Sequence, residues 1–258
     1  LAGCDVAAAL QRAGIRPDDV GRARRDSAKL AGYLELHVEQ GPQLERQNCT
    51  IGAVTHIVGR STMRVTFNGQ AGHSGTTALD KRRDAVQGAA LFILKAHQFV
   101  HDTYLEGMFN CGNVVVKPGL FNVIPEQAVL TVECRHIDEN TLAEMEGAIE
   151  LLAQRCADEY QLSVGVIRTA HMPAAHMAES CIQAVEAASA LMGTSCTRIV
   201  SYAGHDAQML APFTPSGMIF VPSLGGVSQN PREFTRWEDV VMGANVLLHA
   251  VLALVNAL

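Results

Sequence analysis

Strand-like and helix-like segments alternate along most of this chain, and this order restricts it to the α/β class of folds. From Tyr33 to Glu39, polar and apolar residues alternate with a period of two. This alternation predicts a strand with one apolar face and one face that carries ionisable side chains. The other expected strands are residues 51–59, 61–68, 114–116, 128–137, 162–168, 197–201 and 218–221. The expected helices are residues 6–13, Asp80 to about residue 97, 140–160, 179–192, a short one after Asp206, and a last one from Trp237.

These elements fall into two groups. Residues 51–169 are expected to form a β-β-α-β-β-α-β unit, in which one sheet has its helices on a single face. Residues 1–50 and 170–258 resemble parts of a layered α/β domain, whose apolar strand faces need further partners. The chain opens on Leu1 rather than Met, which suggests a fragment or a processed product.

Composition excludes several classes of function. With 48% hydrophobic and 18% charged residues, a packed core is expected, and a net charge of -6 argues against nucleic-acid binding. The longest apolar stretch, residues 246–258, is interrupted by His249 and is too short to span a bilayer, so no membrane partner is expected. Seven cysteines without a Cys-x-x-Cys pair argue against a disulfide framework and favour the cytoplasm.

Two histidines are candidates for chemistry. His37 lies on the polar face of the 33–39 strand between Glu35 and Glu39, where an imidazole could bind zinc while a carboxylate orients it. The alternative is a surface histidine on an edge strand. His73 lies in the glycine-rich loop 69–77, which could bring it close to a ligand. The alternative there is an ordinary polar turn.

Two further residues are candidates for binding a substrate or lining an active site. Arg135 lies on an otherwise apolar strand and could pair with a substrate carboxylate, although Glu133 and Asp138 are possible internal partners. His205 follows Gly204 at a strand-to-helix turn, where α/β domains place active sites. The alternative is that Asp206 caps the helix and His205 is exposed.

Six segments together resemble the metal-dependent amidohydrolases that include allantoate amidohydrolase, N-carbamoyl-L-amino-acid hydrolase and β-ureidopropionase, which share an M20-type metallopeptidase fold. Their order and rough spacing also match, from about residue 30 to the end of the chain. The segments are Glu35-Leu36-His37-Val38-Glu39-Gln40-Gly41-Pro42, Ala71-Gly72-His73-Ser74-Gly75-Thr76-Thr77, Arg82-Arg83-Asp84-Ala85, Asn122-Val123-Ile124-Pro125, Ala203-Gly204-His205-Asp206-Ala207 and Asn230-Pro231-Arg232-Glu233-Phe234-Thr235.

This resemblance implies a layered catalytic domain with an inserted two-layer lid. Residues 51–169 would be the lid, through which family members form homodimers, and residues 1–50 and 170–258 would belong to the catalytic domain. The family's site holds two metal ions, usually zinc or manganese, and His37 corresponds to one of the metal ligands. The residues that correspond to substrate-binding positions are His73, Asn122, Arg135 and His205.

The chain departs from the family pattern in three ways. The family's early histidine, bridging aspartate and Glu-Glu pair, which includes the general base, have no counterpart here, so no catalytic residue is retained. Gln229 stands where the family has a metal-binding histidine, and an amide is a poorer zinc ligand than imidazole. Ala78 replaces a usual proline.

The sequence therefore predicts an enzyme by descent that hydrolyses the ureido C–N bond of small carboxylates, such as N-carbamoyl-L-amino acids or allantoate. The two-metal site is incomplete, and the chain alone is expected to have weak or no activity. The alternative is a non-catalytic dimerising or small-molecule-binding module that descends from such an enzyme. A dipeptidase of the same broad fold group is a third candidate.

Overall fold

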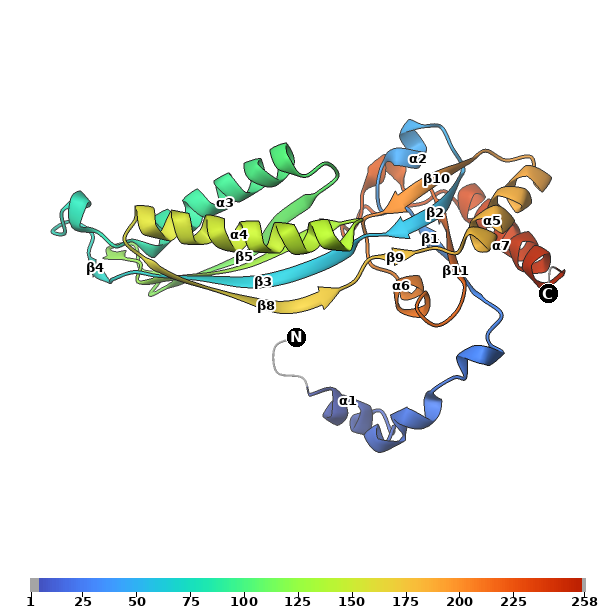
Figure 1. The fold of residues 1–258 in the computed structure, drawn as a ribbon, viewed down its shortest axis with the longest axis horizontal. Coiled ribbons are helices and arrows are strands. Elements are labelled where there is room, and N and C mark those ends of the chain that lie inside the picture. The colour runs from blue at the N-terminus through green and yellow to red at the C-terminus, as the bar shows by residue number, and fades with distance from the viewer. Residues whose placement is uncertain (1–4, 257–258) are drawn as a thin grey trace.

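Two β-sheets organise residues 5–256, the part of the chain that the computed structural model describes (Figure 1). We call them the hub sheet and the arm sheet. The hub sheet has the order β1-β11-β2-β10, and β9 pairs with β2 beside this path. Its strands are β1 (Tyr33–Val38), β2 (Ile51–Ile57), β9 (Ala175–His176), β10 (Cys196–Ser201) and β11 (Ser216–Val221). The arm sheet has the order β5-β7-β3-β8, with strands β3 (Gly59–Asn68), β5 (Met108–Lys117), β7 (Gln127–His136) and β8 (Ser163–Met172).

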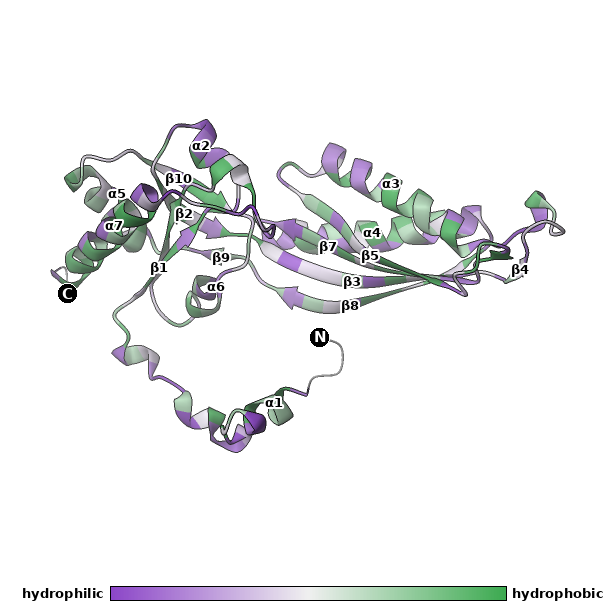
Figure 2. Cartoon of the chain, turned by 180° about the vertical axis from the view of Figure 1, so that it is seen from behind, coloured by the Kyte–Doolittle hydropathy of each residue, from purple (hydrophilic) through white to green (hydrophobic). Residues whose placement is uncertain are grey.

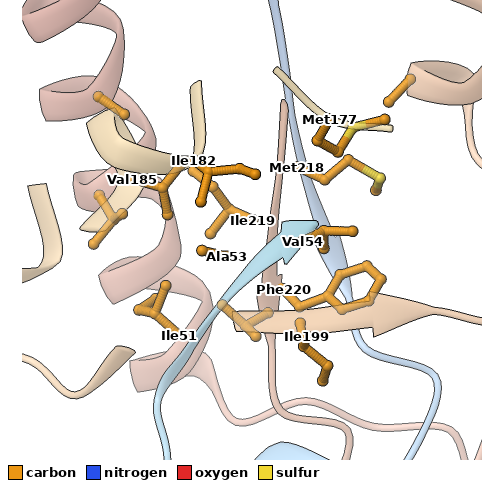
Figure 3. Close-up of a cluster of buried hydrophobic side chains, with 14 of the residues drawn as sticks. Ile51, Ala53, Val54, Met177, Ile182, Val185, Ile199, Met218, Ile219 and Phe220 are labelled. Carbon is orange, nitrogen blue, oxygen red and sulfur yellow. The ribbon is translucent and has the colours of Figure 1, made fainter. Parts of the chain in front are cut away.

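Helices cover the hub sheet on both faces. The helices α5 (Glu179–Leu191) and α7 (Trp237–Asn256) pack against each other and against one face, whereas the short α6 (Asp206–Leu210) packs against β1 and β11. Strand β11 is buried along its whole length. Its side chains meet those of β2, β10 and α5 in one apolar cluster, which Figure 3 shows. The residues labelled there are Ile51, Ala53, Val54, Met177, Ile182, Val185, Ile199, Met218, Ile219 and Phe220.

The arm is an antiparallel sheet with two helices, α3 (Ala85–Thr103) and α4 (Glu139–Glu159), on one of its faces (Figure 1). Alternate residues of β3, namely Met63, Val65 and Phe67, are buried against these helices. Burial of each such side chain contributes about 1.5–3 kcal/mol to stability. The period-two pattern in the sequence therefore corresponds to a strand with one covered face, and the expected α/β class is confirmed.

The arm sheet begins later than expected. Residues 51–57 were predicted to belong to the inserted unit, but β2 pairs with β10 and β11 in the hub sheet. Only Val58 separates β2 from β3, and residues 173–174 separate β8 from β9. The chain thus passes between the two sheets at two short segments. The reason is that β2 is apolar enough to be buried on both faces, as a central strand of the hub requires.

One helix start was also placed too early. The long helix expected from Asp80 begins at Ala85, and its N-cap is Asp84, whose carboxylate accepts a hydrogen bond of 2.9 Å from the Val86 amide. Residues Leu79–Lys81 form a separate 3₁₀ turn. Both aspartates are good N-cap residues, and Arg82, which is extended, interrupts the helical backbone between them.

Short elements complete the chain. The two-residue strands β4 (Gly72–His73) and β6 (Val123–Ile124) pair with each other at the far end of the arm (Figure 1). The N-terminal segment contains α1 (Val6–Arg12) and two 3₁₀ turns, Pro17–Ala23 and Ser27–Lys29, and none of these elements contains a buried residue. The others are α2 (Gln43–Arg46) and the 3₁₀ turn Leu224–Gly226.

Helix α7 is apolar along most of its length (Figure 2). By length and composition alone, it is the one helix among the described residues that could cross a membrane. Gly243, Val246 and Ala250 of this helix are nevertheless buried in the hub, and Gly243 approaches Leu36 and Val221. Cys4 lies outside the described residues, and the six other cysteines are free.

Candidate metal-binding site

Three side chains that can bind a metal meet on the α6 face of the hub sheet. Two of them, Glu35 and His37, are alternate residues of β1 and therefore point to the same side. The third, His205, comes from the loop after β10, where it is the N-cap of α6. Each of the three offers one donor atom, and these atoms all lie within 4.8 Å of one another.

The two histidine rings are in direct contact. The centroids of His37 and His205 are 4.6 Å apart, with an interplanar angle of 70°. The Nδ1 atom of His205 lies 3.8 Å from a carboxylate oxygen of Glu35. Phe220, which is adjacent to His37 in the parallel β1–β11 register, packs against the His205 ring at 5.4 Å. The cluster therefore has one apolar wall, which reduces its contact with water.

Hydrogen bonds hold each of the three groups. His37 donates from Nδ1 to the carbonyl oxygen of Val38 at 2.8 Å, which leaves the lone pair of Nε2 available in the neutral ring. His205 shares a 2.8 Å hydrogen bond between Nε2 and the Ser201 hydroxyl. The second oxygen of Glu35 accepts a 2.8 Å bond from the backbone N–H of Ala207. Glu35 thus also caps the first turn of α6.

Burial changes the proton affinity of this cluster. The side chain of His205 is only 1% exposed, and this burial, with a smaller effect of the neighbouring His37, lowers the pKa of His205 to about 4. Burial, followed by the nearby charges of Glu35 and Asp206, raises the pKa of Tyr33. His205 is therefore uncharged at neutral pH, which is the form that binds metals.

The donor set fits a divalent metal ion such as zinc. Two imidazoles and a carboxylate are common zinc ligands, with bonds of about 2.0–2.2 Å. Two ligand atoms bound to one ion can then be at most about 4.2–4.4 Å apart. The ligand atoms of Glu35, His37 and His205 lie within 4.8 Å of one another, so the side chains would move slightly closer together when an ion binds. The Nδ1 bond of His37 to a backbone carbonyl is the kind of contact that orients a metal-binding histidine.

An open cavity of about 650 Å³ lies between the hub and the arm. Its lining includes Glu39, two residues after His37, and Ala203, two residues before His205. The residues that line it include Glu39 and Gln43 after β1, Arg135 of β7, Tyr202 after β10, and Gln229. Polar groups from four separated segments therefore converge on one space that could hold a small molecule.

Gln229, predicted to stand in a metal-ligand position, lies in the wall of this cavity. It is exposed, it adopts a positive φ of 51°, and its backbone N–H donates to Glu233 at 2.6 Å. An amide at this position can contact a ligand in the cavity but supplies no imidazole.

Arg135 has internal partners in the structure. Its guanidinium donates from Nε and Nη2 to one oxygen of Glu133, at 2.9 and 2.7 Å, and from Nη1 to the carbonyl oxygen of Tyr202. The sequence had left open whether Glu133, Asp138 or a substrate would pair with this arginine, and the structure shows Glu133. The Arg135 side chain is 24% exposed and lines the cavity.

His73 and Asn122 lie together but far from the cluster. They sit at the β4–β6 pair, where Ser74 donates its amide hydrogen to the Asn122 carbonyl at 3.1 Å. His73 accepts the backbone N–H of Gly75 at Nδ1, at 3.0 Å. Figure 1 shows this pair at the end of the arm opposite the hub. The four predicted substrate-binding residues therefore divide into two groups within one chain, with Arg135 and His205 near the hub.

The sequence treated Glu35 and Glu39 alike, as carboxylates that flank His37, and the structure separates them. Glu39 is buried and accepts the amide hydrogens of Gln43 and Leu44 at 2.6 and 2.9 Å, at the start of α2. Glu35 is instead a direct member of the cluster. The sequence feature that could have identified Glu35 is the two-residue period of a strand, which places Glu35 and His37 on the same face. Glu39 lies on that face too, so the period alone could not distinguish the two carboxylates.

Comparisons with known proteins match nearly the whole chain to one family. The family described as peptidase family M20/M25/M40 matches residues 7–253. The chain is 35% identical to an N-carbamoyl-L-amino-acid amidohydrolase of Paenarthrobacter aurescens, over 98% of this chain and 61% of that protein. It is 32% identical to an allantoate amidohydrolase of Escherichia coli, over 84% of this chain and 53% of that protein.

A solved structure is similar along most of the chain. An amidase of the hydantoinase/carbamoylase family from Burkholderia multivorans superposes with a TM-score of 0.82 at 36% identity, over 95% of this chain and 59% of that one. The chain thus spans about 60% of the length of the first relatives it matches.

Proposed function

The chain belongs to peptidase family M20/M25/M40, and from this premise we propose that it is part of an enzyme that hydrolyses the ureido C–N bond of small carboxylates. Its relatives include N-carbamoyl-amino-acid and allantoate amidohydrolases. The observation that carries the proposal is the meeting of Glu35, His37 and His205, whose neighbours in the sequence line an open cavity. Both substrate classes contain a ureido group and a carboxylate, and we leave the choice between them open.

Glu35, His37 and His205 would hold the metal, as zinc or manganese. A bound divalent ion supplies Lewis-acid polarisation of a carbonyl group and lowers the pKa of a bound water. His37 presents Nε2 because its Nδ1 hydrogen is used by Val38. The Phe220 ring beside His205 excludes water from one side, and a lower local dielectric strengthens charge interactions at the site.

Arg135 is proposed to hold the carboxylate of the substrate. Supporting this role, it lines the cavity and is fixed by the Tyr202 carbonyl. The contact with Glu133 uses Nε and Nη2, the edge of the guanidinium that would form a bidentate pair with a carboxylate. A substrate carboxylate must therefore displace Glu133 or accept the second hydrogens of Nη1 and Nη2, because Nη1 also donates to Tyr202. Glu133 is thus a competitor for the bidentate position.

His73 and Asn122 are proposed to act in the site of a neighbouring copy. Within one chain they lie at the far end of the arm, whereas the cluster lies in the hub. A homodimer formed through residues 51–169, the proposed lid, would provide the second copy. Light scattering at micromolar concentration would test this, and a strict monomer would contradict it.

We further propose that these 258 residues alone have weak or no hydrolytic activity. This proposal is supported by the number of metal ligands. The described residues bring only three possible ligands together, whereas the site that the family resemblance implies holds two metal ions. The domain division at residues 1–50, 51–169 and 170–258 is kept as a proposal, with β2 structurally part of the hub sheet. The cytoplasm remains the proposed location, which the free thiols support.

A second candidate function is a non-catalytic module that binds a small carboxylate. It is favoured by the Gln229 substitution and by the internal hydrogen bonds that already satisfy Glu35 and His205. One experiment separates the two functions. Metal content is measured on the purified chain, and N-carbamoyl-amino acids and allantoate are then assayed for hydrolysis with added Zn²⁺ or Mn²⁺. Hydrolysis that requires metal supports the enzyme, whereas ligand binding without metal supports the module.

A further inference from the structure

A second pair of histidines lies where the hub meets the arm. His56 of β2 and His176 of β9 are directly opposite each other in an antiparallel pairing. Their ring centroids are 4.2 Å apart, with an interplanar angle of 70°. Opposed side chains in antiparallel strands have Cβ atoms about 4.5–5.5 Å apart, so the two rings share one small space. Neither histidine belongs to the Glu35–His37–His205 cluster.

Each histidine of the pair lies close in sequence to one of the two segments that connect the sheets. His56 lies two residues before Val58, after which β3 begins the arm sheet. His176 follows residues 173–174, where the chain returns from β8 of the arm (Figure 1). A link between the two rings would therefore join the outgoing and the returning strand at the base of the arm.

One ring nitrogen in this pair lacks a partner. The Nδ1 atom of His56 is buried and has no hydrogen-bond partner among the described residues. Burial, and secondly the neighbouring His176, lower the pKa of His56, so its ring is uncharged at neutral pH. His176 is exposed, which leaves the pair open to solvent from its side. A buried polar atom without a partner is costly, and a ligand that approaches past His176 would remove that cost.

We propose that His56 and His176 form a two-imidazole site for a divalent transition-metal ion, with water as the remaining ligands. Imidazole nitrogens suit Cu²⁺, Ni²⁺ and Zn²⁺, whereas Mg²⁺ and Ca²⁺ require oxygen ligands. Two nitrogens that share such an ion are at most about 4.2 Å apart, which rings with centroids 4.2 Å apart can reach by rotation of the exposed His176.

This site is separate from the first cluster. Strand β11 lies between β1, which carries His37, and β2, which carries His56. Strands are about 4.8 Å apart, so the backbones of β1 and β2 are separated by about 10 Å. In register, His37 is level with Gly52, and His56 lies four residues, about 13 Å, further along β2, so the two histidines do not share an ion. The bound ion would tie β2 to β9 within the hub sheet, beside the two segments that lead to the arm.

The test is a calorimetric titration of the 258-residue chain with Ni²⁺ in a His37→Ala background, which removes the other candidate site. In this background, His176→Ala should weaken Ni²⁺ binding about tenfold or more, because a single imidazole remains. His56→Phe should have the same effect while filling the space of the ring. The background also carries His97→Ala, because the exposed His97 and His101 stand four residues apart on α3 and form a competing pair of imidazoles. His249→Ala, at a partly buried histidine of α7, is the matched control and should leave the affinity unchanged.

A second measurement locates the ion. Paramagnetic Cu²⁺ should broaden the NMR amide signals of residues 55–57 and 175–177 before others, and should no longer do so in His176→Ala. Because His176 is exposed, this variant is expected to fold, which far-UV circular dichroism would verify. The proposal is overturned if Ni²⁺ affinity in the His37→Ala, His97→Ala background is unchanged by His176→Ala and by His56→Phe. It is equally overturned if the broadening is centred elsewhere.

Discussion

The carboxylate of Glu35 lies 3.8 Å from Nδ1 of His205, although one residue belongs to the first strand and the other to a loop near the end of the chain. The same carboxylate accepts the Ala207 amide hydrogen at 2.8 Å and so holds the first turn of α6. Glu35 therefore fixes the position of His205 and places a charged carboxylate, a possible metal ligand, beside it. These two roles can be separated by substitution.

Glu35→Gln should reduce affinity for zinc while the fold is kept. The amide oxygen of glutamine can still accept the hydrogen of Ala207, but the negative charge is lost. We expect affinity to fall about 10- to 100-fold, the range found when groups around a metal site are removed. Competition with a zinc chelator measures the change. Glu150→Gln, at an exposed position of α4, is the control, and equal affinities in the two variants would contradict the assignment.

Stability in metal-free buffer should fall between pH 6.5 and pH 4 because of His205. Burial depresses the pKa of this histidine from 6.5 in the unfolded chain to about 4 in the folded chain. The unfolded chain therefore binds a proton in this range and the folded chain does not, so the contribution is complete above pH 6.5 and is lost as the pH falls towards 4. The loss is roughly 3 kcal/mol.

Denaturant unfolding at several pH values, with EDTA present, measures this dependence. His205→Gln should flatten it, whereas His97→Gln, at an exposed position, should not. If the His205→Gln chain shows the same pH dependence as the original chain, the burial of His205 does not control stability in this range.

Arg135→Ala should weaken binding of N-carbamoyl-amino acids if this arginine holds their carboxylate. A charge-assisted bidentate contact contributes about 1.5–3 kcal/mol, or about ten- to a hundredfold in affinity. Arg135→Lys should weaken binding nearly as much, because lysine lacks the planar fork. Glu133→Gln should strengthen it, because the internal competitor is lost. An NMR titration of the three variants decides between this role and a purely structural pair with Glu133, for which Arg135→Ala would bind normally.

Gln208 should stabilise the base of the arm. This buried residue of α6 donates from its side-chain amide to the carbonyl oxygens of Val58 and Pro173, at 3.1 and 2.8 Å, one on each connecting segment. Gln208→Leu leaves both buried acceptors without a donor, and we expect a loss of about 1–3 kcal/mol for each acceptor that finds no other partner.

Hydrogen exchange would show where that loss occurs. Amides around residues 56–60 and 172–176 should exchange faster in Gln208→Leu than in the original chain. Gln183→Leu, at an exposed position of α5, serves as the control. Unchanged exchange at both segments would mean that Gln208 does not hold the connection.

Much of this fold followed from short-range patterns. The alternation from Tyr33 to Val38 identified β1, and the order of elements gave the α/β class with helices on one face of the arm sheet. The motifs around His37 and His205 were sufficient to suggest the family. These features depend on neighbours within a few residues, such as the two-residue period of a strand, and therefore can be seen in the sequence.

Tertiary structure decided which elements and side chains meet. Strands β2 and β3 are separated by one residue, yet β2 joins the hub because β10 and β11 pair with it. Glu35 and Glu39 flank His37 symmetrically, yet only Glu35 reaches His205, because Glu39 caps α2. Arg135 had two possible acidic partners in the sequence and pairs with Glu133. Sheet membership and side-chain partners depend on contacts between residues far apart in the chain, and local periodicity contains no information about those contacts.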